Sequence, residues 1–260
     1  MAPDLVVDDC STPVWVVDDC SAPDLAVDDY REETGRWEPD MESETTYVVA
    51  DLEMCKLQEL DPPNKHFTME TIQIGAVLLN AAYEIIDSFN TYVKPKYGRV
   101  DTFIRNLTGI DNDMLTDAPD FATALEAFRN WVPEGATIIT WSTCDATQIR
   151  REAQYKGLTT PELQLFLKGW LDAQRLFAKA IASRRNYSLE EALILACVPQ
   201  EGNLHNGYTD AYNTALLFRK IKTENPLKIN EVFRDAKEGQ VKALSFSLGS
   251  LLEGLDLPKE

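Results

Sequence analysis

The sequence predicts an α/β fold, a mixed central sheet flanked by helices, on two observations. Three segments rich in β-branched and apolar residues come first, and segments with helical spacing of apolar residues follow, with one short strand among them. The chain has 260 residues, 44% hydrophobic and 26% charged. This composition is typical of a globular protein long enough for one large domain or two small ones.

The predicted strands are bounded by turn residues and charges. Residues 47–53 form a β-branched run that ends in acids, and residues 136–141 form the last strand. Between them, residues 71–79 and 83–93 predict two strands joined by a turn at residues 80–82.

The predicted helices follow the apolar spacing and the capping residues. The first covers residues 121–132 and stops before Pro133, and the last begins with Thr209 as its N-cap. Residues 226–260 are expected to form a C-terminal helical extension. Together with residues 121–132, the predicted helices cover residues 145–156, 171–183, 189–197 and 209–222.

Residues 1–45 predict a disordered acidic arm. Three units ending in Asp-Asp recur every ten residues, and units this short cannot bury a core. Residues 1–46 contain 14 Asp and Glu against two Arg, a net charge of −12 out of −18 for the whole chain. The ordinary interpretation is that the arm is a solvated spacer or a cloning-derived segment. The functional interpretation is that residues 14–17 bind a protein partner, or that the arm mimics nucleic acid and competes with it for the folded part.

Composition also argues against several classes of protein. The sequence contains no run of about 18 apolar residues, so no membrane-spanning helix is predicted. The first basic residue is Arg31, so the start lacks the basic region of a signal peptide. The five cysteines are odd in number and include no Cys-x-x-Cys pair, which argues against a disulfide framework or a thiolate zinc site. We therefore expect a cytoplasmic protein without a membrane partner.

Five polar residues form an ordered set along the chain. Asp51 and Glu53 lie two apart on a strand and so project from one face, while Leu52 turns into the core. Asp145 follows the fourth strand, and His205 and Asp210 form His-x-x-x-x-Asp before a late helix. Taken singly, each has an ordinary interpretation, because acids are common at solvated strand ends and in first helical turns.

Together, the set resembles the DEDDh (DnaQ-like) 3′–5′ exonucleases. The segments YVVADLE, IQIGAVLLN, FNTYVKP, FIRNLTGIDNDM and HNGYTDAYNTALLFR occur in the order of one branch, the histone-mRNA 3′-end and enhanced-RNAi exoribonucleases with their bacterial KapD-like relatives. Asn206 stands where the tyrosine subclass carries its tyrosine, which favours the histidine subclass. Met54, Ser142, Thr143 and Thr209 depart from residues usual in these relatives, and they bear on substrate preference rather than on the acids.

The resemblance implies an RNase H-like exonuclease domain over residues 46–225. It implies that four acids hold two Mg²⁺ ions, with Mn²⁺ as a substitute, and that His205 is the general base; these acids are Asp51, Glu53, Asp145 and Asp210. Hard oxygen ligands agree with that choice of ion. The implied substrate is the 3′ end of single-stranded RNA, cleaved to nucleoside 5′-monophosphates. The implied substrate-binding positions are Met54, Leu107, Thr108 and Trp141.

Two other functions stay open at this point. One is a DNA 3′–5′ exonuclease of the proofreading type, because nothing in the sequence tests for the 2′-hydroxyl. The other is a catalytically silent module that binds nucleic acid or protein, although an intact set of five residues argues against it. Degradation of labelled RNA and DNA with and without a divalent cation distinguishes these two functions from the exoribonuclease that the resemblance implies.

Overall fold

A computed structural model of the chain describes residues 45–58 and 67–237, without the side chains of residues 235–237. The predicted acidic arm therefore lies outside the described residues except for Thr45, as do residues 238–260 of the predicted extension. The described residues all belong to one compact unit. The predicted domain boundaries near residues 45 and 225 remain predictions.

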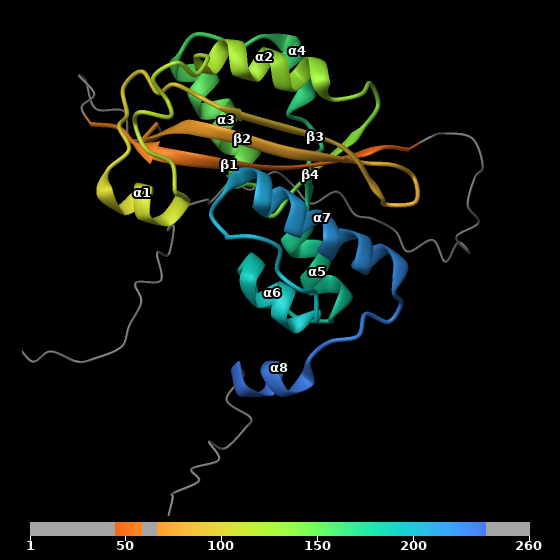
Figure 1. The fold of residues 1–260 in the computed structure, drawn as a ribbon. Helices are drawn as coiled ribbons and strands as arrows, with labels where there is room; N and C mark the ends of the chain where they lie inside the picture. Colours follow the sequence, from red (N-terminus) through yellow and green to blue (C-terminus); the bar gives the residue numbers. More distant parts are fainter. Residues whose placement is uncertain (1–44, 59–66, 238–260) are drawn as a thin grey trace, which may run out of the picture. The chain divides into compact units, whose positions relative to one another are not determined.

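The sheet has the order β3-β2-β1-β4-β5 among the described residues (Figure 1). Strands β1 (Tyr47–Lys56), β2 (Met69–Leu79) and β3 (Ile85–Tyr92) form an antiparallel meander, while β4 (Thr137–Thr140) and β5 (Leu171–Asp172) run parallel to β1. The sheet is therefore mixed, as the sequence predicts. The predicted turn between the second and third strands is also confirmed, because Tyr83 N donates to Asn80 O.

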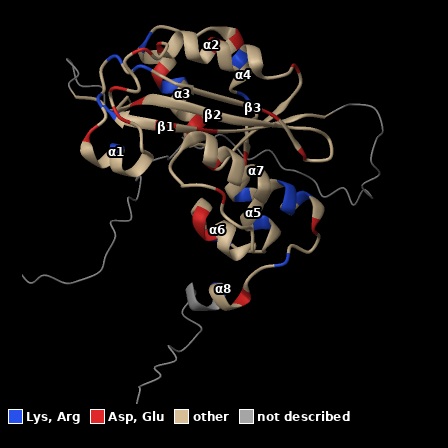
Figure 2. Ribbon diagram, in the orientation of Figure 1, with Lys and Arg blue, Asp and Glu red and all other residues tan. Residues whose placement is uncertain are grey.

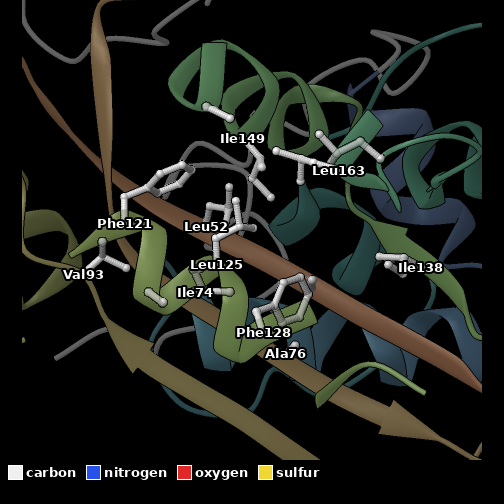
Figure 3. Packing of buried hydrophobic residues seen from close by; sticks show 14 of the residues in the cluster. Leu52, Ile74, Ala76, Val93, Phe121, Leu125, Phe128, Ile138, Ile149 and Leu163 are labelled. Carbon is white, nitrogen blue, oxygen red and sulfur yellow. The ribbon is translucent and has the colours of Figure 1, made fainter. Parts of the chain in front are cut away.

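One face of the sheet is covered by α2 (Phe121–Trp131), α3 (Cys144–Tyr155) and α4 (Pro161–Phe166), which lie above it in Figure 1. The core between them follows the alternation of β1, in which every second side chain points to this face. Figure 3 shows Leu52 of β1 within the same packed cluster as Phe128 of α2. Other buried members of this cluster are Ile74, Phe121, Leu125, Ile149 and Leu163.

The opposite face carries α5 (Ala173–Ala180), α6 (Leu189–Leu195) and α7 (Gly207–Thr223) (Figure 1). The intervening residues of β1 point this way, so Val49 packs with Phe218 of α7. Outside these two layers, α1 (Thr102–Thr108) contacts β1, and α8 (Glu231–Lys237) contacts α6. No helix among the described residues is long and apolar enough to cross a membrane.

The structure adds two short helices that the sequence does not predict and corrects the start of a third helix. Helices α1 and α4 were not predicted, because each is too short to show apolar periodicity; their signals are the capping side chains of Asp101 and Thr160. The helix predicted from residue 171 begins instead at Ala173, after the short strand β5.

The N-cap prediction for the last long helix was wrong. The helix begins at Gly207, and Asn206 is its N-cap, with its side chain accepting a hydrogen bond from Thr209 N. Thr209 therefore lies inside the first turn. Asparagine and threonine are both good N-caps, so composition alone does not choose between them.

Candidate active site

The candidate site lies on the face of β1 that points toward α7. Asp51 and Glu53 follow Val49 on this face, and Leu52 between them is buried on the other. Only 9% of Glu53 is exposed to solvent. The strand period therefore places both carboxylates at one edge of the packed interior, as the sequence predicts.

The first turn of α7 brings the third carboxylate to this edge. Asn206 caps the helix, and Asp210 follows within the first turn, where Asp210 N donates to Asn206 O at 2.8 Å. A carboxylate oxygen from each of Asp51, Glu53 and Asp210 lies within 4.8 Å of the other two. This spacing is short enough for one cation to contact all three residues.

Asp145 reaches the same strand from the opposite layer. It lies in the first turn of α3 and is 6% exposed, and its Oδ1 accepts a hydrogen bond from Leu52 N at 3.2 Å. Its charge raises the pKa of Asp51 and of Glu53. Asp145 is outside the group of three oxygens described above, so it lies at the margin of the cluster. We refer to these four residues as the four-acid cluster.

Burial raises the pKa of all four acids of the cluster, repulsion between carboxylates raises it further for Asp51, Glu53 and Asp145, and His205 acts to lower the pKa of Asp210. Burial is the main cause for each residue, and the charge of Asp210 contributes for the other three. The pKa reaches about 8 for Glu53, about 7 for Asp145 and about 6 for Asp210, and it lies well above the ordinary range for Asp51. No ion pair between described residues includes any of the four. The cluster therefore carries negative charge that the described part of the chain leaves unbalanced.

The donor set fits a divalent cation. Oδ2 of Asp210 accepts a hydrogen bond from His205 N at 3.0 Å, but its buried Oδ1 has no hydrogen-bond partner among the described residues. A buried carboxylate oxygen without a partner costs free energy unless a cation satisfies it. All the candidate ligand atoms are carboxylate oxygens, which suit Mg²⁺ or Mn²⁺.

His205 lies on the loop that leads into α7. Its side chain is exposed, and its backbone has a φ of +63°, a left-handed conformation uncommon for a non-glycine residue. The bond from His205 N to Asp210 ties this backbone to the cluster. The imidazole is thus attached beside the acids while its ring stays accessible to solvent.

The four predicted substrate-binding residues lie in different surroundings. Met54 is half-buried, directly after Glu53 at an irregularity in the pairing of β1 with β2, and Leu107 on α1 is 37% exposed. Thr108 is buried, and its hydroxyl donates to Ile104 O. Trp141 is half-buried, and its indole N–H donates to Tyr187 O. Of the four, Leu107 is the most exposed, Met54 and Trp141 are half-buried, and Thr108 is buried.

Two residues of β2 near the site were not selected from the sequence. Gln73 is fully buried, and its Oε1 accepts a hydrogen bond from Gly207 N at 3.0 Å. A Cβ added to Gly75 would lie 2.1 Å from the carbonyl carbon of Gly207. The sequence does contain a signal, because a glutamine and a glycine inside an apolar strand indicate a polar contact and a close backbone approach.

Comparison with known proteins gives a family and relatives. The family model described as Exonuclease matches residues 48–218, more than half of the chain. The chain is 30% identical over 179 residues to ERI1 exoribonuclease 2 of Danio rerio, which covers 60% of this chain and 32% of that protein. It is 29% identical over 188 residues to the PolC-type DNA polymerase III of Caldanaerobacter subterraneus, which covers 72% of this chain and 12% of that protein. The chain spans about a third or less of the length of these relatives.

Solved structures share the fold. The nuclease domain of 3′hExo, a DEDDh family member bound to rAMP, superposes with a TM-score of 0.57 at 22% identity, covering 72% of this chain and 96% of that domain. A 3′-exonuclease that recognises the 3′ end of a histone mRNA stem-loop gives a TM-score of 0.58 at 19% identity, with coverages of 73% and 86%. These similarities confirm the predicted RNase H-like exonuclease fold.

Proposed function

The chain belongs to the exonuclease family, and from this membership we propose that it is a metal-dependent 3′–5′ exoribonuclease. It hydrolyses single-stranded RNA from the 3′ end and releases nucleoside 5′-monophosphates. The observation that carries the proposal is the four-acid cluster, where three carboxylates lie within 4.8 Å of one another and no described Lys or Arg forms an ion pair with them. A site that buries acids in this way is suited to hold a cation rather than to stabilise the fold alone.

The proposed metal ligands are Asp51, Glu53, Asp145 and Asp210. A pair of divalent cations bound there would supply an activated water and stabilise charge on the scissile phosphate and the leaving 3′ oxygen. The charges of Asp145, Glu53 and Asp210 all raise the pKa of Asp51, and the resemblance to the family makes Asp51 the residue proposed to hold both cations. Asp145 is oriented by its bond from Leu52 N, and Asp210 by its bond from His205 N.

His205 is the proposed general base. An imidazole accepts a proton near neutral pH, and the exposed ring can reach a water at the acids while its backbone is fixed to Asp210. Because the backbone is anchored and the ring is free, the side chain can approach the attacking water when a 3′ end is bound. Its contribution would be to remove the proton of the attacking water.

Met54 and Leu107 are the proposed contacts to the terminal bases. Apolar side chains beside a base tolerate any sequence, which suits an enzyme that removes successive nucleotides. Thr108 and Trp141 are also proposed to contact the terminal bases through their exposed atoms, although the side chain of each donates a hydrogen bond within the protein. Basic and acidic residues are mixed over the described helices and strands (Figure 2), so we expect a modest salt dependence, as on short single strands.

RNA is the favoured substrate because the chain is similar to ERI1 exoribonuclease 2 and to the solved 3′-exonuclease that recognises the histone mRNA stem-loop. The similarity to a PolC-type DNA polymerase supports the second candidate, a DNA 3′–5′ exonuclease. The test is degradation of 5′-labelled RNA and DNA strands of identical sequence in Mg²⁺, in Mn²⁺ and in EDTA, with the Asp51→Asn protein as a control for contaminating nucleases.

We expect a ladder that shortens from the 3′ end on RNA with either cation, slower degradation of DNA, and no product in EDTA. Faster degradation of DNA would favour the second candidate. Binding of both strands without degradation would identify a catalytically silent module and overturn the proposal.

A cytoplasmic location is proposed from the cysteines. Cys55 and Cys197 are free thiols in the described part of the chain, and Cys55 is buried. Free thiols are typical of reducing compartments. Fractionation of cells that produce the full chain would test this, and recovery from an oxidising compartment would contradict it.

A further inference from the structure

We propose that Gln73 is a positioning residue for the metal site, because it fixes the first turn of α7, which carries Asp210. The inference rests on the proposed function only in that the four-acid cluster binds a divalent cation. Gln73 does not belong to the cluster. It acts on the distance between Asp210 and the two acids of β1.

Gln73 connects three elements through one buried side chain. It lies on β2 directly opposite Glu53 in the antiparallel pairing with β1. Its Oε1 accepts a hydrogen bond from Gly207 N of α7 at 3.0 Å, and its Nε2 donates to Oδ1 of Asn90 on β3 at 2.9 Å. Gly207 N is one of the first N–H groups of the helix, which have no partner within the helix itself. The side chain of Gln73 supplies that partner and so holds the helix start over the sheet.

The helix start is also pressed against the sheet backbone. Gly75 pairs with Asp51, and a Cβ at Gly75 would meet the backbone of Gly207 at 2.1 Å. A Cβ at Gly207 would lie 3.1 Å from Asp51 O and 3.3 Å from Gly75 N. The two glycines therefore allow the close approach, and the Gln73 hydrogen bond fixes where along the strands the helix begins.

This placement bears directly on the proposed ligands. Asp210 lies three residues after Gly207, within the same turn, so a shift of Gly207 moves the Asp210 carboxylate by a similar amount. Metal sites depend on ligand distances to within roughly 0.2 Å. A small displacement of the turn would therefore weaken cation binding while leaving the hydrophobic contacts of α7 with the sheet in place.

The test measures Mn²⁺ binding to the full-length protein by isothermal titration calorimetry, without nucleic acid. Gln73→Met removes the acceptor for Gly207 N while keeping a similar volume. Asn90→Ala is the matched control, because it removes the exposed partner of Gln73 and leaves the bond to Gly207. Gly207→Ala is a second variant, which favours the helix but places a methyl group against the Asp51 carbonyl.

We expect Gln73→Met to weaken Mn²⁺ binding by about 10-fold or more, the usual scale for residues that support metal ligands, and Asn90→Ala to weaken it by less than about 3-fold. Gly207→Ala is expected to weaken Mn²⁺ binding while circular dichroism shows the helix content unchanged, so it decides the question if Gln73→Met does not fold.

Wild-type affinity in folded Gln73→Met or in Gly207→Ala would overturn the inference and leave the proposed function intact. A wild-type protein that binds Mn²⁺ but degrades neither RNA nor DNA would overturn the proposed function, and weaker Mn²⁺ binding by Gln73→Met would still support the inference. A wild-type protein that binds no Mn²⁺ would overturn both.

Discussion

The described part of the chain buries acidic residues in two clusters, and the two clusters differ in whether a basic side chain balances their charge. The four-acid cluster lies between β1 and the first turns of α3 and α7. A second group, the Glu70–Lys156–Glu152 cluster, lies where β2 meets the other end of α3. Helix α3 contributes to both, with Asp145 in its first turn and Glu152 two turns later.

Every charge of the Glu70–Lys156–Glu152 cluster has a partner. Lys156 Nζ lies 2.7 Å from a carboxylate oxygen of Glu70 and 2.7 Å from one of Glu152. Glu70 also accepts hydrogen bonds from the backbone N–H groups of residues 96–98. Glu152 accepts hydrogen bonds from the backbone N–H and from the side-chain hydroxyl of Thr71. Burial acts to lower the pKa of Lys156, but the two carboxylates outweigh it and the pKa is raised. This cluster joins β2, α3 and the loop after β3 without an external ligand.

The four-acid cluster has no such cation, and its pKa values are raised by burial and repulsion. Both clusters are buried, so burial alone does not distinguish a structural acid from a candidate ligand. The difference is the presence of an internal counter-charge. The unbalanced four-acid cluster is therefore the one that needs an external cation, and we expect mutations to have opposite effects on the two clusters.

The largest expected effect is the loss of activity in Asp51→Asn. Removing the proposed bridging ligand should lower the rate of RNA hydrolysis by ~10⁴-fold or more, the scale seen when a catalytic group is deleted. The melting temperature in EDTA should stay the same or rise, because one of several repelling buried carboxylates has been removed. Near-wild-type rates in a highly purified preparation would contradict the assignment of the site.

His205→Ala should have the next largest effect. We expect the rate to fall by ~10²–10⁴-fold, because the proton of the attacking water loses its acceptor. Mn²⁺ affinity measured by calorimetry should change little, since the hydrogen bond to Asp210 comes from the backbone N–H of His205, which the variant keeps. A variant that loses cation binding together with activity would show that His205 supports the cluster rather than acting as the base.

Lys156→Met should affect stability rather than chemistry. It leaves Glu70 and Glu152 buried without their cation, which typically costs ~3–5 kcal/mol of unfolding free energy, measurable by urea denaturation. Lys220→Met is the matched control, because Lys220 pairs with Glu224 near the surface at 3.6 Å and should cost below ~1 kcal/mol. Equal losses in the two variants would remove the distinction drawn between the clusters.

The smallest expected effect is a pH dependence of stability without metal. The raised pKa values mean that the folded protein holds protons that the unfolded chain releases, so stability falls as the pH rises from the ordinary carboxyl pKa of about 4 to the raised values of about 6 to 8. In EDTA, Asp51→Asn should gain stability over wild type by on the order of 1 kcal/mol per pH unit in this range. Saturating Mg²⁺ should reduce that gain. A gain that is independent of pH and of Mg²⁺ would show that Asp51 does not titrate together with the other acids of the cluster.

Much of the site could be predicted from local sequence patterns. The resemblance to the DEDDh exonucleases rests on Asp51, Glu53, Asp145, His205 and Asp210, and the family match confirms it. The alternation of β1 places Asp51 and Glu53 on one face, which follows from the two-residue period of a strand. The start of α7 could not be fixed in this way, because Asn206 and Thr209 are both good caps.

Other features depend on contacts between distant segments. Gln73 meets Gly207 across 134 residues, and Leu52 meets Asp145 across 93. Periodicity does not report such pairs, since it describes only neighbours along the chain. The same limit applies to Lys156, whose role depends on Glu70 of another element.

The sequence by itself determined which side chains could do the chemistry and to which face of a strand or turn of a helix each belongs, because those depend on backbone geometry over a few residues. Tertiary structure alone decided which buried acids meet a lysine and which are left to one another. Packing of α3 and α7 against the two faces of the sheet sets that outcome, since only packing fixes distances between residues far apart in the chain.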